Sequence, residues 1–206
     1  QAKQEYQKTK DPLYQKEIAR CHNIQWAKKI SLNSAYGAIG NQYFRFYDVR
    51  QATAITSSGQ FVIQYIEKQV NKYMNEILQT KDQVDYIVAS DTDSIYLTLD
   101  KLVDKVCKDK TKEQKLNFVD KVATQKIEPF IEKCFKELAD YTNAYEQKMV
   151  MKREVIADKG IWTAKKRYML NVLDEEGFRY EEPKLKIMGI EAVKSSTPEV
   201  CRVGIK

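Results

Sequence analysis

The sequence predicts an α+β fold, because helical and strand periodicities both occur along its 206 residues. Two short runs rich in β-branched and aromatic residues, 86–89 and 95–99, flank a polar segment and predict a β-hairpin. Further strands are predicted at 149–157, at the apolar end of the segment 161–173, and at 185–188. Long helical patterns precede and separate these strands, so helices should supply much of the core.

The composition is that of a globular protein, with 43% hydrophobic and 31% charged residues. No stretch of about 18 apolar residues and no charged-then-apolar leader occurs, which disfavours membrane and secretory classes. The formal net charge of +6 permits a polyanionic partner without requiring one. Four widely spaced cysteines and a single histidine suggest neither a disulfide framework nor a zinc site, and fit a reducing cytosol. Because the chain begins with Gln1, we expect it to be a piece of a longer protein.

A helix is predicted to begin at Asp11-Pro12, and the apolar spacing from residue 21 predicts helix up to Gly37 or Gly40. After it, 43–49 is rich in aromatic residues and predicts an extended segment. Residues 52–78 form the longest periodic region and predict a core helix. Its core positions are Ile55, Val62, Ile66, Val70, Tyr73 and Ile77.

Three polar side chains share one face of the helix predicted before Gly37. Lys29, Asn33 and Tyr36 lie four and three residues apart, so they fall within an arc of about 60° on one face. A cation, an amide and a phenol therefore share one side of the helix. We expect these three side chains to be exposed, with Ile30 or Ala35 turned toward packing.

The tip of the predicted hairpin carries Asp91 and Asp93. Side chains two apart on an extended chain point to the same side, so these carboxylates can be presented together. Two close anions repel unless a cation lies between them, and hard oxygen ligands favour Mg²⁺. The alternative is ordinary turn chemistry, in which the aspartates cap their own backbone.

A basic cluster with an adjacent aromatic residue follows later in the chain, at Lys165, Lys166, Arg167 and Tyr168. Lysine and arginine neutralise phosphates while a ring packs on sugar or base, so the cluster suits a nucleic-acid backbone. The alternative is a solvated surface. Glu154 lies on the preceding predicted strand and would by itself be an ordinary surface glutamate.

Together these motifs resemble those of family B DNA polymerases, most closely the replicative polymerases of T-even-like bacteriophages. Residues 29–37 match the fingers pattern Lys-x-x-x-Asn-Ser-x-Tyr-Gly, 91–94 match the palm pattern Asp-Thr-Asp-Ser, and 165–168 match the primer-side pattern Lys-Lys-x-Tyr. The three occur in the order of the family. Similarity continues through 46–48, 52–56 and 186–189, and so covers nearly the whole chain from about residue 20.

The resemblance implies a DNA-directed DNA polymerase, a nucleotidyltransferase that adds dNTPs to a primer 3′-hydroxyl with two Mg²⁺ ions. It implies that Lys29 and Asn33 contact the triphosphate, and that Tyr36 and Gly37 border the nascent base pair. Asp93 would be a metal ligand and Asp91 its close neighbour in the metal site.

In the same family, residues 165–168 would hold the primer duplex, through Lys165, Lys166, Arg167 and Tyr168. Glu154 falls where the family places a supporting acid. Lys152 stands where close relatives have a second acid, which departs from the pattern.

The resemblance also implies an organisation and a setting for the protein. Residues 1–41 would be the C-terminal part of the fingers, 42–189 a palm with a mainly antiparallel sheet packed on helices, and 190–206 the start of the thumb. The expected partners are primer–template DNA, dNTP, a sliding clamp and other replisome proteins, in the cytoplasm of an infected bacterial host, with no membrane.

One family motif is absent from the sequence. The pattern Asp-x-x-Ser-Leu-Tyr-Pro, which supplies another metal-binding aspartate in the family, does not occur, and neither do the proofreading acids. We therefore expect the isolated chain to be inactive. Two other functions stay open: a non-catalytic nucleic-acid-binding module, and one half of a split polymerase.

Overall fold

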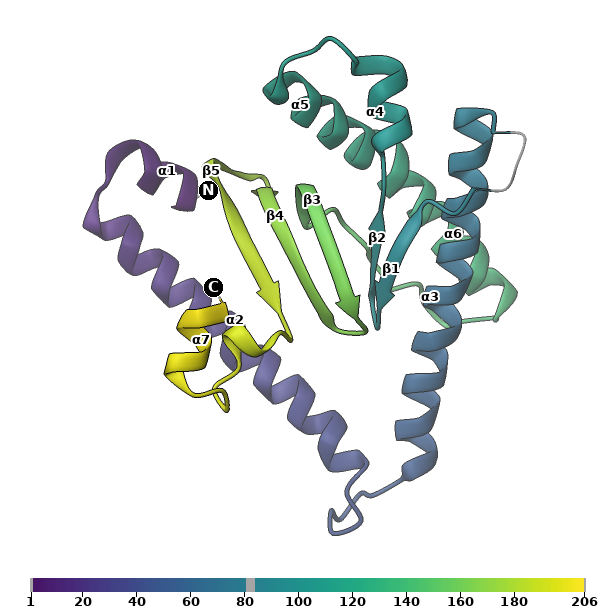
Figure 1. Cartoon of the computed structure of the whole chain (residues 1–206). Helices are drawn as coiled ribbons and strands as arrows, with labels where there is room; N and C mark the ends of the chain where they lie inside the picture. The colour runs from purple at the N-terminus through teal and green to yellow at the C-terminus, as the bar shows by residue number, and fades with distance from the viewer. Residues whose placement is uncertain (1, 81–83, 206) are drawn as a thin grey trace. The chain divides into compact units, whose positions relative to one another are not determined.

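The computed structural model describes residues 2–80 and 84–205 (Figure 1). The chain divides into two compact units, Gln1–Phe61 and Val62–Lys206, with the long helix α3 (Val49–Leu78) running from one into the other. The secondary structure combines helices with antiparallel strands, which confirms the predicted α+β class. No helix among the described residues is long and apolar enough to cross a membrane.

The N-terminal unit contains α1 (Ala2–Thr9), α2 (Pro12–Ile39) and the beginning of α3. As predicted, α2 starts at Asp11-Pro12, where the Asp11 carboxylate accepts a hydrogen bond from the amide of Leu13 at 2.9 Å. This contact satisfies one of the amides that a helix start leaves unpaired. Gly40 caps the other end of α2.

The connection between α2 and α3 is made of turns, so the extended segment predicted at 43–49 is wrong. The Asn41 side chain accepts from the amide of Tyr43 at 3.0 Å, and the Asp48 side chain accepts from the amide of Arg50 at 2.9 Å. Short polar side chains that bond nearby amides favour turns and helix starts over strands. These local hydrogen bonds favour turns here, although the aromatic residues favour an extended strand.

The apolar residues of α2 are not covered, which corrects the expectation that Ile30 or Ala35 packs. None of the residues of α2 is buried, and Ile30 is 55% exposed. Helical spacing predicts which residues share a face, but burial needs a neighbouring element.

The C-terminal unit is built on the second part of α3. Ile66, Val70, Met74 and Leu78 are buried at a spacing of four and form one stripe. They pack with α6 (Glu128–Tyr141), and the rings of Tyr73 and Phe130 stack with centroids 4.1 Å apart.

Two predicted core positions of α3 were wrong. Ile55 is 54% exposed and Ile77 is 41% exposed. Met74 and Leu78 are core residues in place of Ile77. The buried residues of α3 repeat every four positions from Ile66, and Ile77 does not fall on that repeat.

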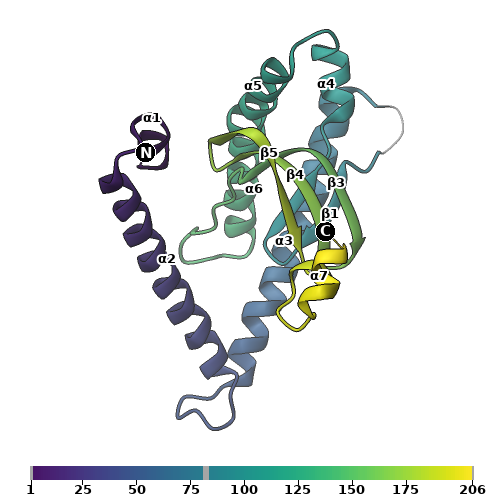
Figure 2. The ribbon, with the colours of Figure 1, turned by 60° about the vertical axis from the view of Figure 1, so that its left-hand side comes forward.

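Two antiparallel sheets complete this unit. The hairpin of β1 (Ile87–Asp91) and β2 (Ser94–Leu97) is the one predicted, and its ribbon lies beside α3 (Figures 1 and 2). Its apolar residues pack on the core that α3 and α6 build. The second sheet has the order β3 (Val155–Ala164), β4 (Arg167–Glu175), β5 (Phe178–Met188). β3 begins six residues later than the 149–157 pattern predicted, and β5 begins earlier than 185 because it pairs along most of β4.

Three further helical segments lie between the two sheets in sequence: α4 (Asp100–Cys107), α5 (Lys112–Val122) and a π-helical turn (Ala123–Ile127) that leads into α6. The chain ends in a short 3₁₀ turn (Glu191–Val193) and α7 (Glu199–Ile205). Pro129 lies in the first turn of α6, where a missing amide costs no helical hydrogen bond.

A partly buried ion-pair network connects the three-stranded sheet to these helices. The Arg153 guanidinium bonds Asp174 at the end of β4 and Asp120 of α5, the latter at 2.6 Å. The amide of Arg153 donates to the Glu128 carboxylate at 2.8 Å. Asp174 is only 1% exposed and also accepts from the amide of Gly177 at 2.9 Å. The network thereby fixes the segment that enters β3.

Candidate functional site

The tip of the β1–β2 hairpin is a two-residue turn at Thr92 and Asp93, between the paired residues Asp91 and Ser94. Thr92 has φ 56°, and the amide of Asp93 donates to the carbonyl of Asp91 at 2.6 Å. The chain is therefore not extended from Asp91 to Asp93, so the strand geometry used to predict their common orientation is wrong. Both carboxylates still lie at the hairpin tip, Asp91 half-buried and Asp93 exposed.

A second tight turn carries the basic cluster. β3 ends at Ala164 and β4 begins at Arg167, so Lys165 and Lys166 form the turn itself. Lys166 has φ 63°, and Gly189 lies directly behind it with φ +66°. A Cβ on Gly189 would clash with the carbonyl oxygen of Lys166, which is why glycine is needed there.

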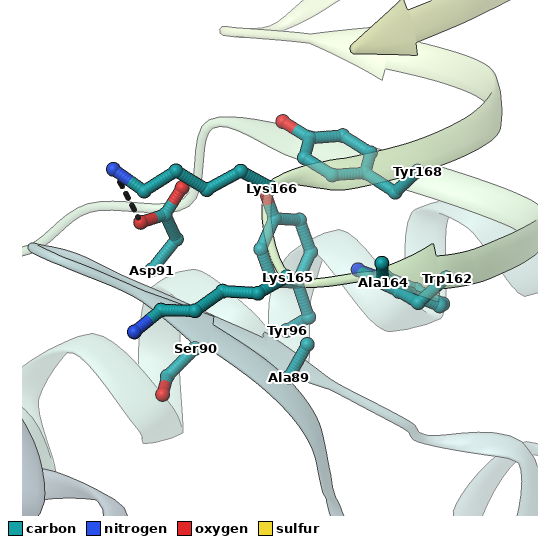
Figure 3. Close-up of a pocket in the computed structure, with 9 residues that line it drawn as sticks. All are labelled: Ala89, Ser90, Asp91, Tyr96, Trp162, Ala164, Lys165, Lys166 and Tyr168. Carbon is teal, nitrogen blue, oxygen red and sulfur yellow. Dashed lines mark ion pairs between the residues drawn. The ribbon is translucent and has the colours of Figure 1, made fainter. Parts of the chain in front are cut away.

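The two turns meet at a hollow of ≈ 190 Å³ (Figure 3). The ammonium nitrogen of Lys166 lies 3.6 Å from a carboxylate oxygen of Asp91, and Lys165 extends beside Ser90. The lining residues come from both hairpins: Ala89, Ser90, Asp91, Tyr96, Trp162, Ala164, Lys165, Lys166 and Tyr168. Two motifs that are far apart in the sequence thus share one site, with cations and a carboxylate at its edge.

Three aromatic rings support the hollow from the strands. The ring centroids of Tyr96 lie 5.4 Å from Trp162 and 5.3 Å from Tyr168. Burial raises the pKa of the Tyr96 phenol, and a hydrogen bond with Tyr168 raises it further, so this phenol stays neutral. Gly160 leaves room for the indole, because a Cβ there would lie 2.7 Å from the Trp162 ring.

Sequence reasoning did not assign Tyr96, Trp162 or Gly189 to the site. The strand register explains the place of one of them, because Trp162 pairs directly with Tyr168 across the β3–β4 hairpin. Cross-strand aromatic pairs stabilise such a hairpin, and here they steady the turn that holds the lysines. Gly189 ends the 186–189 segment, whose sequence resembles the family but indicates no role for the glycine.

Comparison with known proteins agrees with the two motifs at the hollow. Residues 1–202 match the family described as DNA polymerase family B. The chain belongs to this family. It is 48% identical over 189 residues to a DNA-directed DNA polymerase of Escherichia phage RB69, an alignment that covers 87% of this chain and 21% of the phage protein.

A second relative is similarly close. The chain is 44% identical over 202 residues to a DNA-directed DNA polymerase of Enterobacteria phage T4, covering 93% of this chain and 22% of that protein. This family B polymerase chain therefore spans about a fifth of the length of these curated relatives. The predicted resemblance is confirmed.

The residues of this family B chain that match the pattern Lys-x-x-x-Asn-Ser-x-Tyr-Gly lie in the N-terminal unit. Lys29, Asn33, Tyr36 and Gly37 are all exposed on the continuous helix α2, with Tyr36 at 42%. The helix geometry keeps the first three on one face, as predicted.

Glu154 is not brought to the hollow. It immediately precedes Val155, the first residue of β3, whereas Trp162 and Ala164 at the other end of that strand line the hollow. A strand of this length spans roughly 30 Å. The carbonyl of Glu154 accepts from the amide of Glu176 at 2.6 Å, which ties it to the β4–β5 turn. Its role as a supporting acid stays a prediction.

The chemistry of the hairpin tip suits a hard divalent cation. Among the described residues, no group of three or more His, Cys, Asp or Glu side chains could hold a metal. Mg²⁺, however, commonly takes one or two carboxylates and completes its shell with water and phosphates. The Asp91 carboxylate already meets a cation, the Lys166 ammonium, so its position is compatible with positive charge.

Proposed function

We propose that this chain is part of a DNA-directed DNA polymerase that adds dNTPs to a primer 3′-hydroxyl. The observation that carries the proposal is the Asp91 carboxylate beside Lys165 and Lys166 at one hollow. A module that only bound nucleic acid would have no use for acids facing phosphates, since like charges repel. Membership of DNA polymerase family B supports the same function.

Asp91 and Asp93 are proposed to hold Mg²⁺, two ions being present in the whole enzyme. When bound, the ions would stabilise the attacking 3′-oxygen and the leaving pyrophosphate. The protein's part is to present the carboxylates on a tight hairpin whose strands are anchored in the core. Thr92 and Ser94 restrain that tip through hydrogen bonds to Asp91 at 3.0 and 3.2 Å.

The basic turn is proposed to hold primer–template DNA. Lys165, Lys166 and Arg167 are exposed and can neutralise backbone phosphates, while Tyr168 is buried beneath them. On α2, Lys29 and Asn33 are proposed to contact the triphosphate of the incoming dNTP. Tyr36 and Gly37 would border the nascent base pair.

The proposal extends to the parent protein. Residues 1–41 would belong to its fingers, 42–189 to its palm and 190–206 to its thumb. That protein would act in the cytoplasm of an infected bacterial host, with a sliding clamp and other replisome proteins. The isolated chain should not polymerise, because two carboxylates without the aspartate of Asp-x-x-Ser-Leu-Tyr-Pro should bind Mg²⁺ weakly.

DNA binding by the purified chain tests the proposal directly. Lys165→Ala and Lys166→Ala should each weaken binding to a primer–template duplex and reduce the salt dependence by about one unit of slope. Lys133→Ala removes the same charge from an exposed pair on α6 and is the matched control. If the two variants matched the control in affinity and slope, the basic turn would be a solvated surface.

Primer extension is the second measurement. The purified chain should extend no primer with Mg²⁺ and all four dNTPs. Extension that is abolished by Asp93→Ala would contradict the proposed incompleteness of the metal site.

A further inference from the structure

The ion pair between Asp91 and Lys166 joins two hairpins, and each partner is restrained by its own hairpin. The Asp91 carboxylate accepts a hydrogen bond from the Thr92 hydroxyl at 3.0 Å. The Lys166 backbone has a positive φ and is backed by Gly189. The backbone of the two turns places these side chains within reach of each other, and the Lys166 ammonium lies 3.6 Å from the Asp91 carboxylate although the lysine side chain is 63% exposed.

Each partner of this ion pair also has a proposed ligand. Under the proposed function, the Lys166 ammonium binds a DNA phosphate and the Asp91 carboxylate binds a divalent cation. Neither charge can make its full interaction with a new partner while it remains paired with the other. DNA and cation should consequently each compete with the same ion pair.

We propose that the Asp91–Lys166 ion pair couples binding of DNA to binding of the divalent cation. With neither ligand present, the Lys166 ammonium neutralises Asp91. A phosphate that binds Lys166 leaves Asp91 free for a cation, and a cation at Asp91 leaves Lys166 free for a phosphate. The inference rests on the proposed function and adds one property to it. Whichever of DNA and the cation binds first, it strengthens binding of the other.

The size of the coupling follows from the exposure of the pair. Exposed ion pairs shift an equilibrium by about twofold to fivefold. Linkage is reciprocal, so the cation must strengthen DNA binding by the same factor by which DNA strengthens cation binding. Lys165 offers a matched control, because it lines the same hollow but makes no ion pair within the described residues.

A double-mutant cycle on DNA binding tests the coupling without any metal. Affinity for a primer–template duplex is measured in EDTA at fixed salt, for the wild-type chain and the variants Asp91→Asn, Asp93→Asn, Lys166→Met and Asp91→Asn/Lys166→Met. Both single aspartate variants remove one negative charge from the hairpin tip. Asp91→Asn should strengthen binding about twofold to fivefold more than Asp93→Asn, because only Asp91 holds Lys166. In the Lys166→Met background, Asp91→Asn should strengthen binding no more than Asp93→Asn does in the wild-type chain.

A titration with Mn²⁺, followed by electron paramagnetic resonance, tests the reciprocal effect. The affinity of the chain for Mn²⁺ should rise by the same factor when duplex is saturating, after subtraction of Mn²⁺ bound by the duplex alone. Lys166→Met should lose that rise, whereas Lys165→Met should keep it.

The outcomes separate this inference from the function on which it rests. Equal effects of Asp91→Asn and Asp93→Asn in the wild-type chain would overturn the coupling and leave the DNA-binding role of the turn intact. An Asp91→Asn gain that is as large with Lys166→Met as without it would do the same. Duplex binding with a salt slope that neither Lys165→Met nor Lys166→Met changes would overturn the proposed role of the turn, and the coupling with it. Each substitution removes one charge from a side chain that is at least partly exposed, and thermal unfolding checks that each variant is folded.

Discussion

Gly189 packs directly against the carbonyl of Lys166, so closely that a Cβ at residue 189 would overlap the oxygen. The contact joins the end of β5 to the turn between β3 and β4, where Tyr168 and Met188 form the neighbouring strand pair. The basic turn is therefore supported from behind by this glycine. Its conformation, at φ +66°, is also one that other residues rarely adopt.

Gly189→Ala should displace the Lys165–Lys166 turn and weaken duplex binding. Gly177→Ala is the control, because Gly177 has φ +82° but open space where its Cβ would go. The control should lose about 1–2 kcal/mol of unfolding free energy, the cost of a left-handed alanine. Gly189→Ala should lose more and, unlike the control, reduce DNA affinity. Urea unfolding and duplex binding measure the two effects, and equal DNA affinities would contradict a supporting role for Gly189.

In the whole polymerase, Asp93→Asn should mainly lower the maximal rate of nucleotide incorporation. A residue that holds the proposed Mg²⁺ acts on the transition state, and metal stabilisation there is worth several kcal/mol. The maximal rate should therefore fall by roughly several powers of ten. Pre-steady-state incorporation measures it. A normal rate with weakened duplex binding would instead assign Asp93 to DNA contact.

Lys29→Ala in the whole polymerase should weaken the apparent affinity for dNTP as well as the rate. The loss should be that of one charge-assisted hydrogen bond, about 1.5–3 kcal/mol. Lys28→Ala is the control, since Lys28 is also exposed on α2 but lies about 100° around the helix from Lys29. Equal dNTP dependence of the two variants would remove Lys29 from the proposed phosphate contact.

Asp174→Ala should destabilise the fold strongly, because it leaves the largely buried Arg153 guanidinium with one fewer partner. Arg153 has a side chain 12% exposed and Asp174 one that is 1% exposed. Removal of one partner of a buried pair costs about 3–5 kcal/mol. Glu137→Ala breaks an exposed pair on α6 and should cost less than about 1 kcal/mol in the same urea titration. Similar losses would show that the network contributes no more than a surface pair.

Stability should depend on pH through Glu175. A hydrogen bond from the Tyr180 hydroxyl at 2.7 Å lowers the pKa of this carboxyl, and Lys184 and Lys186 lower it further against the opposing effect of burial. A carboxyl whose pKa is lower in the folded state stabilises the fold above its unfolded pKa, and this contribution is lost as pH falls through the folded pKa. The stability difference between wild type and Glu175→Gln should therefore be largest near neutral pH and shrink in acid. Thermal unfolding from pH 7 to pH 3 measures this difference, and a constant difference would contradict the shift.

Local patterns in the sequence were enough to predict the β1–β2 hairpin, the start of α2 at Asp11-Pro12 and the order of the three motifs. Each depends on residues close together in the chain: strand-forming runs on either side of a turn, or a side chain that caps the next amides. The stripe of Lys29, Asn33 and Tyr36 is equally local, since helix geometry alone puts these residues on one face.

Only the tertiary structure decided which of these features meet. Asp91 and Lys166 come together because two hairpins pack side by side, and Glu154 is kept away because β3 is extended along β4. The exposure of Ile30 on α2 likewise depends on which elements lie nearby, which periodicity does not specify. Contacts between residues distant in sequence arise from packing of the whole fold, so the spacing of amino acids predicts each hairpin but not the site between them.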